Sequence, residues 1–326
     1  MGSAAGPLRD RSRVEVAEQG CRAGVGQDGP VGEGPDGAQE RRVPAASEGV
    51  VVTRLFRGTL VLAAALALGF LLLPIVAIFL RVPPGELVSA LQSDVAKDAL
   101  VVTFETNLIA LALILLLGTP TAYWAATRRS RLRDLVVTLI ELPLVLPPAV
   151  AGIGLLAAFG RLGLLGGTFA ALGIDVAFNK VAVVLAVTFV ASPFYVRTAV
   201  SAFEALDPNL PAAARTLGAG PGGVFFRVAL PLAAGGLGAG AALAFARGLG
   251  EFGATIMFAG SLQGVTQTLS LAIYEQFDLD FDVALAISAV LVATSAATLL
   301  SVKLVTRWRS TSSSPIHSVA SSPLSS

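Results

Sequence analysis

Long apolar segments bracketed by charged residues dominate the chain between about residues 58 and 302. The segments are 16 to 23 residues long and contain no Asp, Glu, Lys or Arg. An α-helix needs about 20 predominantly apolar residues to cross the hydrocarbon core of a bilayer. The shortest segment reaches that length when it is extended to Phe178 and Thr198. We therefore predict an all-α integral membrane protein with six transmembrane helices, at Gly58–Leu80, Thr106–Thr127, Leu142–Gly160, Val181–Val196, Val228–Ala246 and Val283–Val302.

Both ends of the chain have a different composition from these segments. Residues 1–50 are rich in Gly, Pro, Ala and charges of both signs, and residues 310–326 contain nine serines. Such sequences bury too little apolar surface to offset the entropy lost on ordering. We predict a disordered tail at 1–50, a first transmembrane helix with an outer loop at 51–99, the main transmembrane domain at 100–305, and a disordered Ser-rich tail at 306–326.

The composition excludes several classes of protein. Hydrophobic residues make up 54% of the chain and charged residues 14%, against about 25% charged residues in a soluble domain. The single Cys, Cys21, and the single His, His317, both lie in the predicted tails. This excludes a His/Cys metal site, an internal disulfide and a histidine-based catalytic centre in the folded part. The net charge of +1 also gives no basic surface for nucleic acid.

Lys and Arg residues are distributed unequally between the predicted loops. Cytoplasmic loops of membrane proteins carry an excess of these residues. With both termini in the cytoplasm, twelve basic residues lie on that side and five lie outside, which is the topology that we predict. The twelve are Arg54, Arg57, Arg128, Arg129, Arg131, Arg133, Arg197, Arg215, Arg227, Lys303, Arg307 and Arg309; the five are Arg81, Lys97, Arg161, Lys180 and Arg247.

The longest predicted cytoplasmic loop runs from about Ser201 to Val228 and carries the most specific motif. Its helical stretch, Ala212–Leu217, is followed by Gly218, which permits the positive φ of a helix-ending turn. A spacer then leads to Leu230-Pro231. The pattern resembles the EAA loop of bacterial ABC importer permeases, with Ala212 where that family usually has Glu. The resemblance makes this stretch a coupling helix that docks on an ATPase, formed by Ala212, Ala213, Ala214, Arg215, Leu217 and Gly218; a plain connector is the alternative.

Two further stretches narrow the resemblance. Glu141–Gly152 looks like the third helix of molybdate permeases, and Leu243–Thr255 looks like the segment that closes their fifth helix. The resemblance covers roughly Leu100 to Val302. It implies the type I ABC importer permease fold and import of molybdate, or of tungstate, by alternating access. Sulfate and thiosulfate permeases share much of this layout and are the alternative within the class.

The resemblance also implies the partners. Two copies of the chain would form the pathway, two copies of a separate ATPase would bind ATP and Mg²⁺, and an extracytoplasmic molybdate-binding protein would deliver the anion. This chain has no Gly-x4-Gly-Lys-Ser/Thr phosphate loop and is expected to bind no cofactor and no metal. A stand-alone secondary transporter or channel is the alternative from a different class, but no acidic residue interrupts the six segments to relay protons.

A few residues near the predicted spans are candidates for the translocation path. Arg247 and Glu251 are four apart, so they share a helix face and can pair. A cation there would attract a dianion; a pair that only fixes the helix is the slightly favoured alternative. Pro147 and Pro148 are adjacent and are expected to bend the third segment; the bend could shape a cavity or be a packing irregularity. The candidates are Pro147, Pro148, Arg247, Glu251 and Thr255, with Thr266, Gln267 and Thr268 as further hydrogen-bond donors.

Glycine residues in the fifth segment suggest close helix packing. Gly236 and Gly240 form a small-xxx-small pair, with Gly235 and Gly238 nearby. Small residues at this spacing let two helices approach closely within a membrane. We predict a packing role for them rather than contact with a ligand.

Overall fold

The computed structural model describes residues 46–311, with side chains described from residue 56 to residue 301 except at Pro84. Within 46–311 every regular element is a helix. The elements are α1 (Ala46–Arg81), α2 (Pro84–Gln92), α3 (Asp94–Thr127), α4 (Arg131–Val145), α5 (Pro148–Phe159), α6 (Gly166–Ala171), α7 (Lys180–Glu204), α8 (Asn209–Thr216), α9 (Pro221–Val224), the π-helix η1 (Phe225–Ala229), α10 (Leu230–Leu249), α11 (Gly253–Ala259), α12 (Leu269–Leu279) and α13 (Phe281–Thr311).

The predicted tails and domain limits can be compared with these helices only where they overlap the described residues. Most of residues 1–50 and 306–326 lies outside the described residues, and the overlapping parts belong to α1 and α13. The chain divides between Leu62 and Ala63, inside α1, into two compact units, of which the larger contains the helix bundle. The boundary expected between residues 99 and 100 stays a prediction and falls within α3.

Five of the described helices are long and apolar enough to cross a membrane, and a bent pair raises the number to six. The pair is α4 and α5, whose axes differ by 115°. The predicted third span therefore consists of two helices, and the bend expected at Pro147 and Pro148 is present. Leu146 has an extended backbone because the following proline disfavours the helical conformation, and Pro147 and Pro148 lack the N–H groups that would continue α4.

The first half of this broken span also begins earlier than expected. α4 starts at Arg131, inside the basic stretch that the charge pattern assigned to a loop. The hydroxyl of Ser130 accepts a hydrogen bond from the backbone N–H of Arg133 at 3.2 Å. This is an ordinary helix N-cap, which satisfies one of the backbone donors that lack a partner at a helix start.

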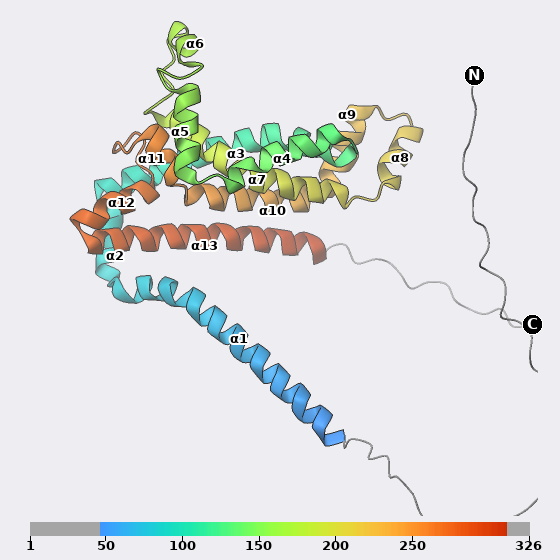
Figure 1. Ribbon diagram of the computed structural model, residues 1–326, viewed down its shortest axis with the longest axis horizontal. Helices are drawn as coiled ribbons and strands as arrows, with labels where there is room; N and C mark the ends of the chain where they lie inside the picture. Colours follow the sequence, from blue (N-terminus) through green and yellow to red (C-terminus); the bar gives the residue numbers. More distant parts are fainter. Residues whose placement is uncertain (1–45, 312–326) are drawn as a thin grey trace, which may run out of the picture. The chain divides into compact units, whose positions relative to one another are not determined.

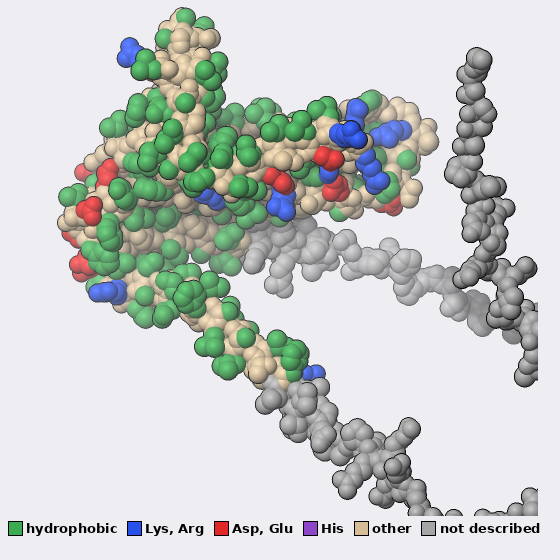
Figure 2. Space-filling view, in the orientation of Figure 1, with side chains coloured by type: hydrophobic (Ala, Val, Ile, Leu, Met, Phe, Trp, Pro, Cys, Tyr) green, Lys and Arg blue, Asp and Glu red, His purple; other side chains and the backbone are tan. Residues whose placement is uncertain are grey.

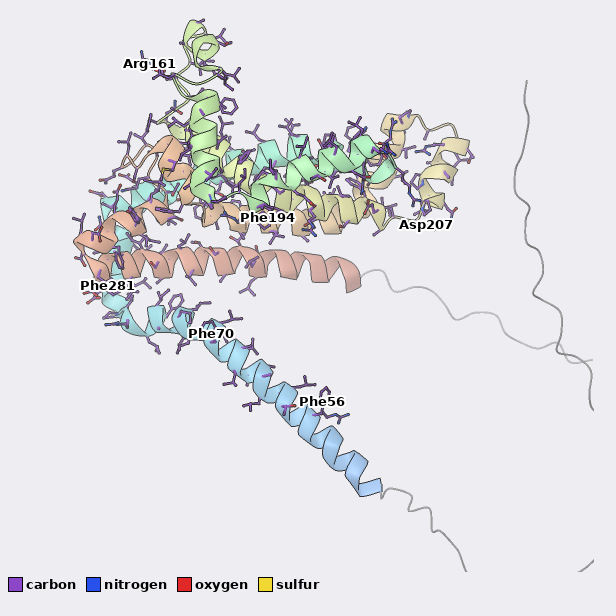
Figure 3. All side chains as sticks on the ribbon, in the orientation of Figure 1. Phe56, Phe70, Arg161, Phe194, Asp207 and Phe281 are labelled. Atoms are coloured by element: carbon purple, nitrogen blue, oxygen red, sulfur yellow. The ribbon has the colours of Figure 1, made fainter. Side chains whose placement is uncertain are left out.

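Helix α7 forms the centre of the bundle. It packs against α3 on one side and α10 on another, and α4 and α11 also contact it. Figure 1 shows α3, α4, α7 and α10 running side by side, with α8 and α9 at one end and α11 and α12 at the other. Figure 3 marks these two ends by Asp207, beside α8, and by Phe281, where α13 begins.

Small side chains fill the contacts between these helices. Fully or almost fully buried alanines include Ala110, Ala122 and Ala125 of α3 and Ala182 and Ala199 of α7. Lipid is as apolar as leucine, so close van der Waals packing through small residues, rather than the hydrophobic effect, stabilises helix contacts in a membrane. The buried alanines explain why so few large apolar residues are needed in the core.

The glycine pair of α10 takes part in this packing. A Cβ at Gly236 would lie 2.5 Å from Cβ of Ala202 on α7, and one at Gly240 would lie 3.1 Å from Cβ of Thr198. Gly235 and Gly238 have nothing within 4 Å in the described structure. Of these four glycines, only Gly236 and Gly240 lie close against α7.

We expect Gly236→Ala to destabilise the bundle by about 1–3 kcal/mol, the usual range for an overpacked contact. Gly235→Ala is the matched control, since it adds the same methyl group to the same helix where the described structure leaves space. Thermal unfolding of both purified variants measures the difference. Equal unfolding temperatures would contradict the packing role.

Candidate functional site

The connection between α7 and η1, residues 205–224, is named here the α8 loop. Asp207 Oδ1 accepts a hydrogen bond from the N–H of Asn209 at 2.9 Å, and α8 begins at this residue. The helix thus starts three residues before the predicted Ala212. It ends at Thr216, and Gly218 follows two residues later with a φ of +86°, the left-handed conformation that glycine adopts without strain.

The predicted coupling residues share an exposed surface. Ala212, Ala213, Arg215 and Gly218 are exposed, and Leu217 is 88% exposed. Ala214 is half-buried. α8 therefore presents small side chains, followed by the exposed Leu217, at its surface.

A cavity of about 950 Å³ lies behind this helix. Figure 2 shows that Lys and Arg side chains gather at this end of the bundle with Asp and Glu side chains among them, and that Asp and Glu side chains also gather around α12 at the other end. Six charged side chains line the cavity together with aromatic and small residues: Arg128, Arg129, Arg133, Asp134, Glu204 and Arg215.

Arg133 makes more polar contacts than any of the other charged groups in this cavity. Its guanidinium donates to Oε1 of Glu204 at 2.6 Å, to Oδ1 of Asp134 at 3.0 Å and to the carbonyl of Ala125 at 3.2 Å. In the sequence, Arg133 stands out only as one of the predicted cytoplasmic charges. Its position at the start of a helix after a basic run gave no signal for a contact with Glu204, 71 residues away.

The predicted path residues lie at the opposite end of the bundle. Pro147 precedes α5 directly, and Pro148 is its first residue. A Cβ at Gly253 would lie 2.6 Å from Cβ of Pro148, so the start of α5 sits tightly against the start of α11. The structure therefore brings Pro148 close to the segment that contains Glu251 and Thr255.

Arg247 and Glu251 form the predicted ion pair. Nη2 of Arg247 lies 2.8 Å from Oε2 of Glu251, and the side chain of Glu251 is 1% exposed. Its other oxygen, Oε1, accepts a hydrogen bond from the N–H of Ala254 at 2.8 Å. Glu251 thus caps α11 and joins it to α10, which supports the structural interpretation of this pair.

Other polar side chains are buried near this pair. Thr255, Gln267, Thr268 and Asn107 are at most 3% exposed, and each has a side-chain oxygen without a hydrogen-bond partner in the described structure. Buried polar atoms of native proteins nearly always have a partner, so this group suits contact with water or a polar ligand. Thr266 differs, because its hydroxyl accepts from the N–H of Leu262 and closes its own loop.

Asn107 is the residue of this group that the sequence analysis missed. It lies in the middle of α3 and donates to the carbonyl of Thr103 at 2.9 Å. A Cβ at Gly248 of α10 would overlap its Oδ1, so α3 and α10 meet here. The available signal was an amide side chain inside an apolar segment, which in a membrane span is a functional candidate.

Nothing in the described part of the chain suggests a metal centre. Among residues 46–311, no three His, Cys, Asp or Glu side chains gather as a metal ion would require. The two polar regions are instead a cavity with an exposed helix at one end and a buried hydrogen-bonding group at the other.

Comparisons with known proteins extend this description. The family described as "Binding-protein-dependent transport system inner membrane component" matches residues 118–310. A molybdenum transport system permease protein of Mycobacterium bovis is 47% identical over 233 residues, which are 72% of this chain and 88% of the relative. A probable transport system permease protein of Clostridium pasteurianum is 35% identical and covers 73% of this chain and 83% of its own length.

Solved structures show the same fold at lower sequence identity. A bacterial alginate ABC transporter aligns with a TM-score of 0.61 at 16% identity, over 81% of this chain and 98% of its own. An inward-facing methionine ABC transporter aligns with a TM-score of 0.50 at 18% identity, over 66% and 94%. Both matches support the predicted permease fold of ABC importers.

Proposed function

Because the chain belongs to the family of binding-protein-dependent transport system inner membrane components, we propose that it is the permease subunit of an ATP-driven molybdate importer. The observation that supports molybdate as the substrate is the 47% identity to a molybdenum transport permease over 72% of the chain. Tungstate is a tetrahedral dianion like molybdate and is a second expected cargo.

The proposed importer has four further requirements. Two copies of the permease enclose the pathway, and a separate ATPase dimer binds ATP and Mg²⁺. An extracytoplasmic binding protein delivers the anion, and the lipid bilayer surrounds the apolar helices. The exposed surface of α8 supports an ATPase contact, since small residues permit close seating in a groove.

The proposed orientation places both termini and the α8 loop in the cytoplasm. Arg128, Arg129, Arg133 and Arg215 around the α8 cavity support it, because short cytoplasmic loops are rich in basic residues. Asp278, Asp280 and Asp282 near the start of α13 then face outward, at the end that also carries the buried polar group.

The proposed mechanism is alternating access. ATP binding draws the two ATPase subunits together, the two α8 helices follow, and the bundle opens outward to take the anion from the binding protein. Hydrolysis then restores the inward-facing state. In this scheme the residues of α8 transmit force, and the hydroxyls of Thr255 and Thr268 are available to donate to an oxyanion when the outer end opens. The amide NH2 groups of Asn107 and Gln267 already donate to Thr103 and Glu275, so these two residues offer oxygens without a partner, which accept hydrogen bonds.

The charged residues at the outer end suggest that this chain distinguishes weakly between molybdate and sulfate. Glu251 neutralises Arg247, so no free positive charge of this pair faces the anion. Hydroxyl donors bind molybdate and sulfate by the same hydrogen bonds. Selection between them therefore falls mainly to the binding protein, and a sulfate or thiosulfate permease is the second candidate.

Deleting the gene is expected to lower cellular molybdenum strongly at trace external molybdate. Mass spectrometry measures the metal, with and without excess sulfate, and the intact chain should restore it. Unchanged molybdenum together with impaired sulfate uptake would favour the second candidate. A stand-alone transporter or channel would be indicated if the purified chain restored transport in vesicles that contain no ATPase.

A further inference from the structure

The α8 loop is fastened at its start by an ion pair. Glu204 is the last residue of α7, directly before the loop, and its Oε1 lies 2.6 Å from Nη2 of Arg133. The same guanidinium donates through Nε to the carbonyl of Ala125 in the last turn of α3. One side chain of α4 thus ties the start of the loop to α3.

The loop is fastened at its end by aromatic rings. Phe225 is the first residue of η1, directly after the loop, and its ring centroid lies 4.8 Å from that of Tyr123 on α3. Phe203 of α7 completes the group, 5.3 Å from Tyr123 in an edge-to-face arrangement. Such pairs add about 0.5–1.5 kcal/mol beyond the burial of their surfaces.

The backbone at this end is a π-helix over Phe225–Ala229, where the N–H of Leu230 donates to the carbonyl of Phe225. Short π-helical turns inside α-helices are rare and occur frequently at functional sites. Here the wider turn lies between the α8 loop and α10 and includes the ring that contacts Tyr123.

Both fastenings converge on the last turns of α3, which continues to the opposite end of the bundle. Tyr123 and Asn107 are 16 residues apart in this helix, or about 24 Å at 1.5 Å per residue. Asn107 meets Gly248 of α10, one residue from Arg247. A movement of the α8 loop that is passed to α3 therefore has one continuous helix leading to the buried polar group, in which Pro120 removes a single backbone hydrogen bond.

We propose that Arg133 and Tyr123 are positioning residues that fasten the two ends of the α8 loop to α3, so that displacement of α8 by the ATPase moves the bundle. This inference rests on the proposed function. Without these fastenings the loop moves separately from the bundle, and ATP is hydrolysed without import.

The test uses the complete complex of permease, ATPase and binding protein in proteoliposomes. The measured quantity is the number of molybdate ions imported per ATP hydrolysed. Arg133→Gln and Glu204→Gln should each lower this ratio at least fivefold while ATP hydrolysis stays within twofold of the wild type. The double variant should be no worse than Arg133→Gln, because Arg133→Gln already removes the contact with Glu204.

Matched variants separate positioning from general damage. Arg129→Gln removes a charge from the same cavity, and within residues 46–311 Arg129 has no carboxylate within 4.0 Å, so its ratio should match the wild type. Tyr123→Phe keeps the ring and should keep the ratio, whereas Tyr123→Ala should lower it. Glu204 is half-exposed, so its Gln variant is expected to assemble and carries the test if Arg133→Gln does not.

The fastening proposal is overturned if Glu204→Gln and Tyr123→Ala import as many ions per ATP as the wild type. It is also overturned if Arg129→Gln lowers the ratio as much as Arg133→Gln, because cavity charge alone would then explain the effect. The proposed function fails separately, if the wild-type complex hydrolyses ATP and imports no molybdate.

Discussion

Gly218→Asp is expected to abolish molybdate uptake while the protein remains in the membrane at the normal amount. Gly218 follows α8 with a φ of +86°, a conformation that costs most other residues about 1–2 kcal/mol and Asp less than that. The new carboxylate would also lie beside the C-terminal carbonyls of α8, where negative charge is unfavourable. Both effects act on the exposed surface that the proposed ATPase contact requires.

Gly220→Asp is the matched control for this prediction. Gly220 is exposed two residues further on, with a φ of −68° and nothing within 4 Å. It precedes α9 directly, a position that accepts Asp readily. Cellular molybdenum and immunoblotted membrane protein measure both variants. Normal uptake by Gly218→Asp would contradict the role of this turn in coupling.

Glu251→Ala is expected to destabilise the protein by about 3 kcal/mol, the lower part of the range for breaking a buried ion pair. The lower part applies because the side chain of Arg247 is 28% exposed and regains some solvation. The variant also removes the cap from the N–H of Ala254. Thermal unfolding in detergent measures the loss.

Two further variants separate the contribution of the helix cap from the contribution of the buried ion pair. Glu251→Gln retains an oxygen for Ala254 but leaves Arg247 unpaired, so its destabilisation should be intermediate. Glu141→Ala breaks a looser and more exposed pair, in which Arg197 Nε lies 3.7 Å from Oε1, and should cost less than about 1 kcal/mol. Equal effects of Glu251→Ala and Glu141→Ala would show that burial of Glu251 contributes nothing.

The candidate site was predictable where a local rule defines it. The turn at Gly218 follows from the backbone freedom of glycine, and the Arg247–Glu251 pair follows from helical spacing. The pairing of Arg133 with Glu204 and the contact of Tyr123 with Phe225 were not predictable, because they join residues 71 and 102 positions apart. Such contacts depend on which helices become neighbours, and no periodicity in one sequence records that.

The sequence by itself determined the class of the protein, the long helices and the position of the α8 loop. These follow from the length and apolarity of single segments, since a helix in lipid must satisfy its own backbone hydrogen bonds. Only the tertiary structure decided that the bend expected at Pro147 and Pro148 amounts to 115°, and that Glu251 is a buried helix cap. It also decided that both ends of the α8 loop contact α3 or are tied to it through Arg133. These features depend on packing between segments, where the space left by one helix decides what its neighbour can do.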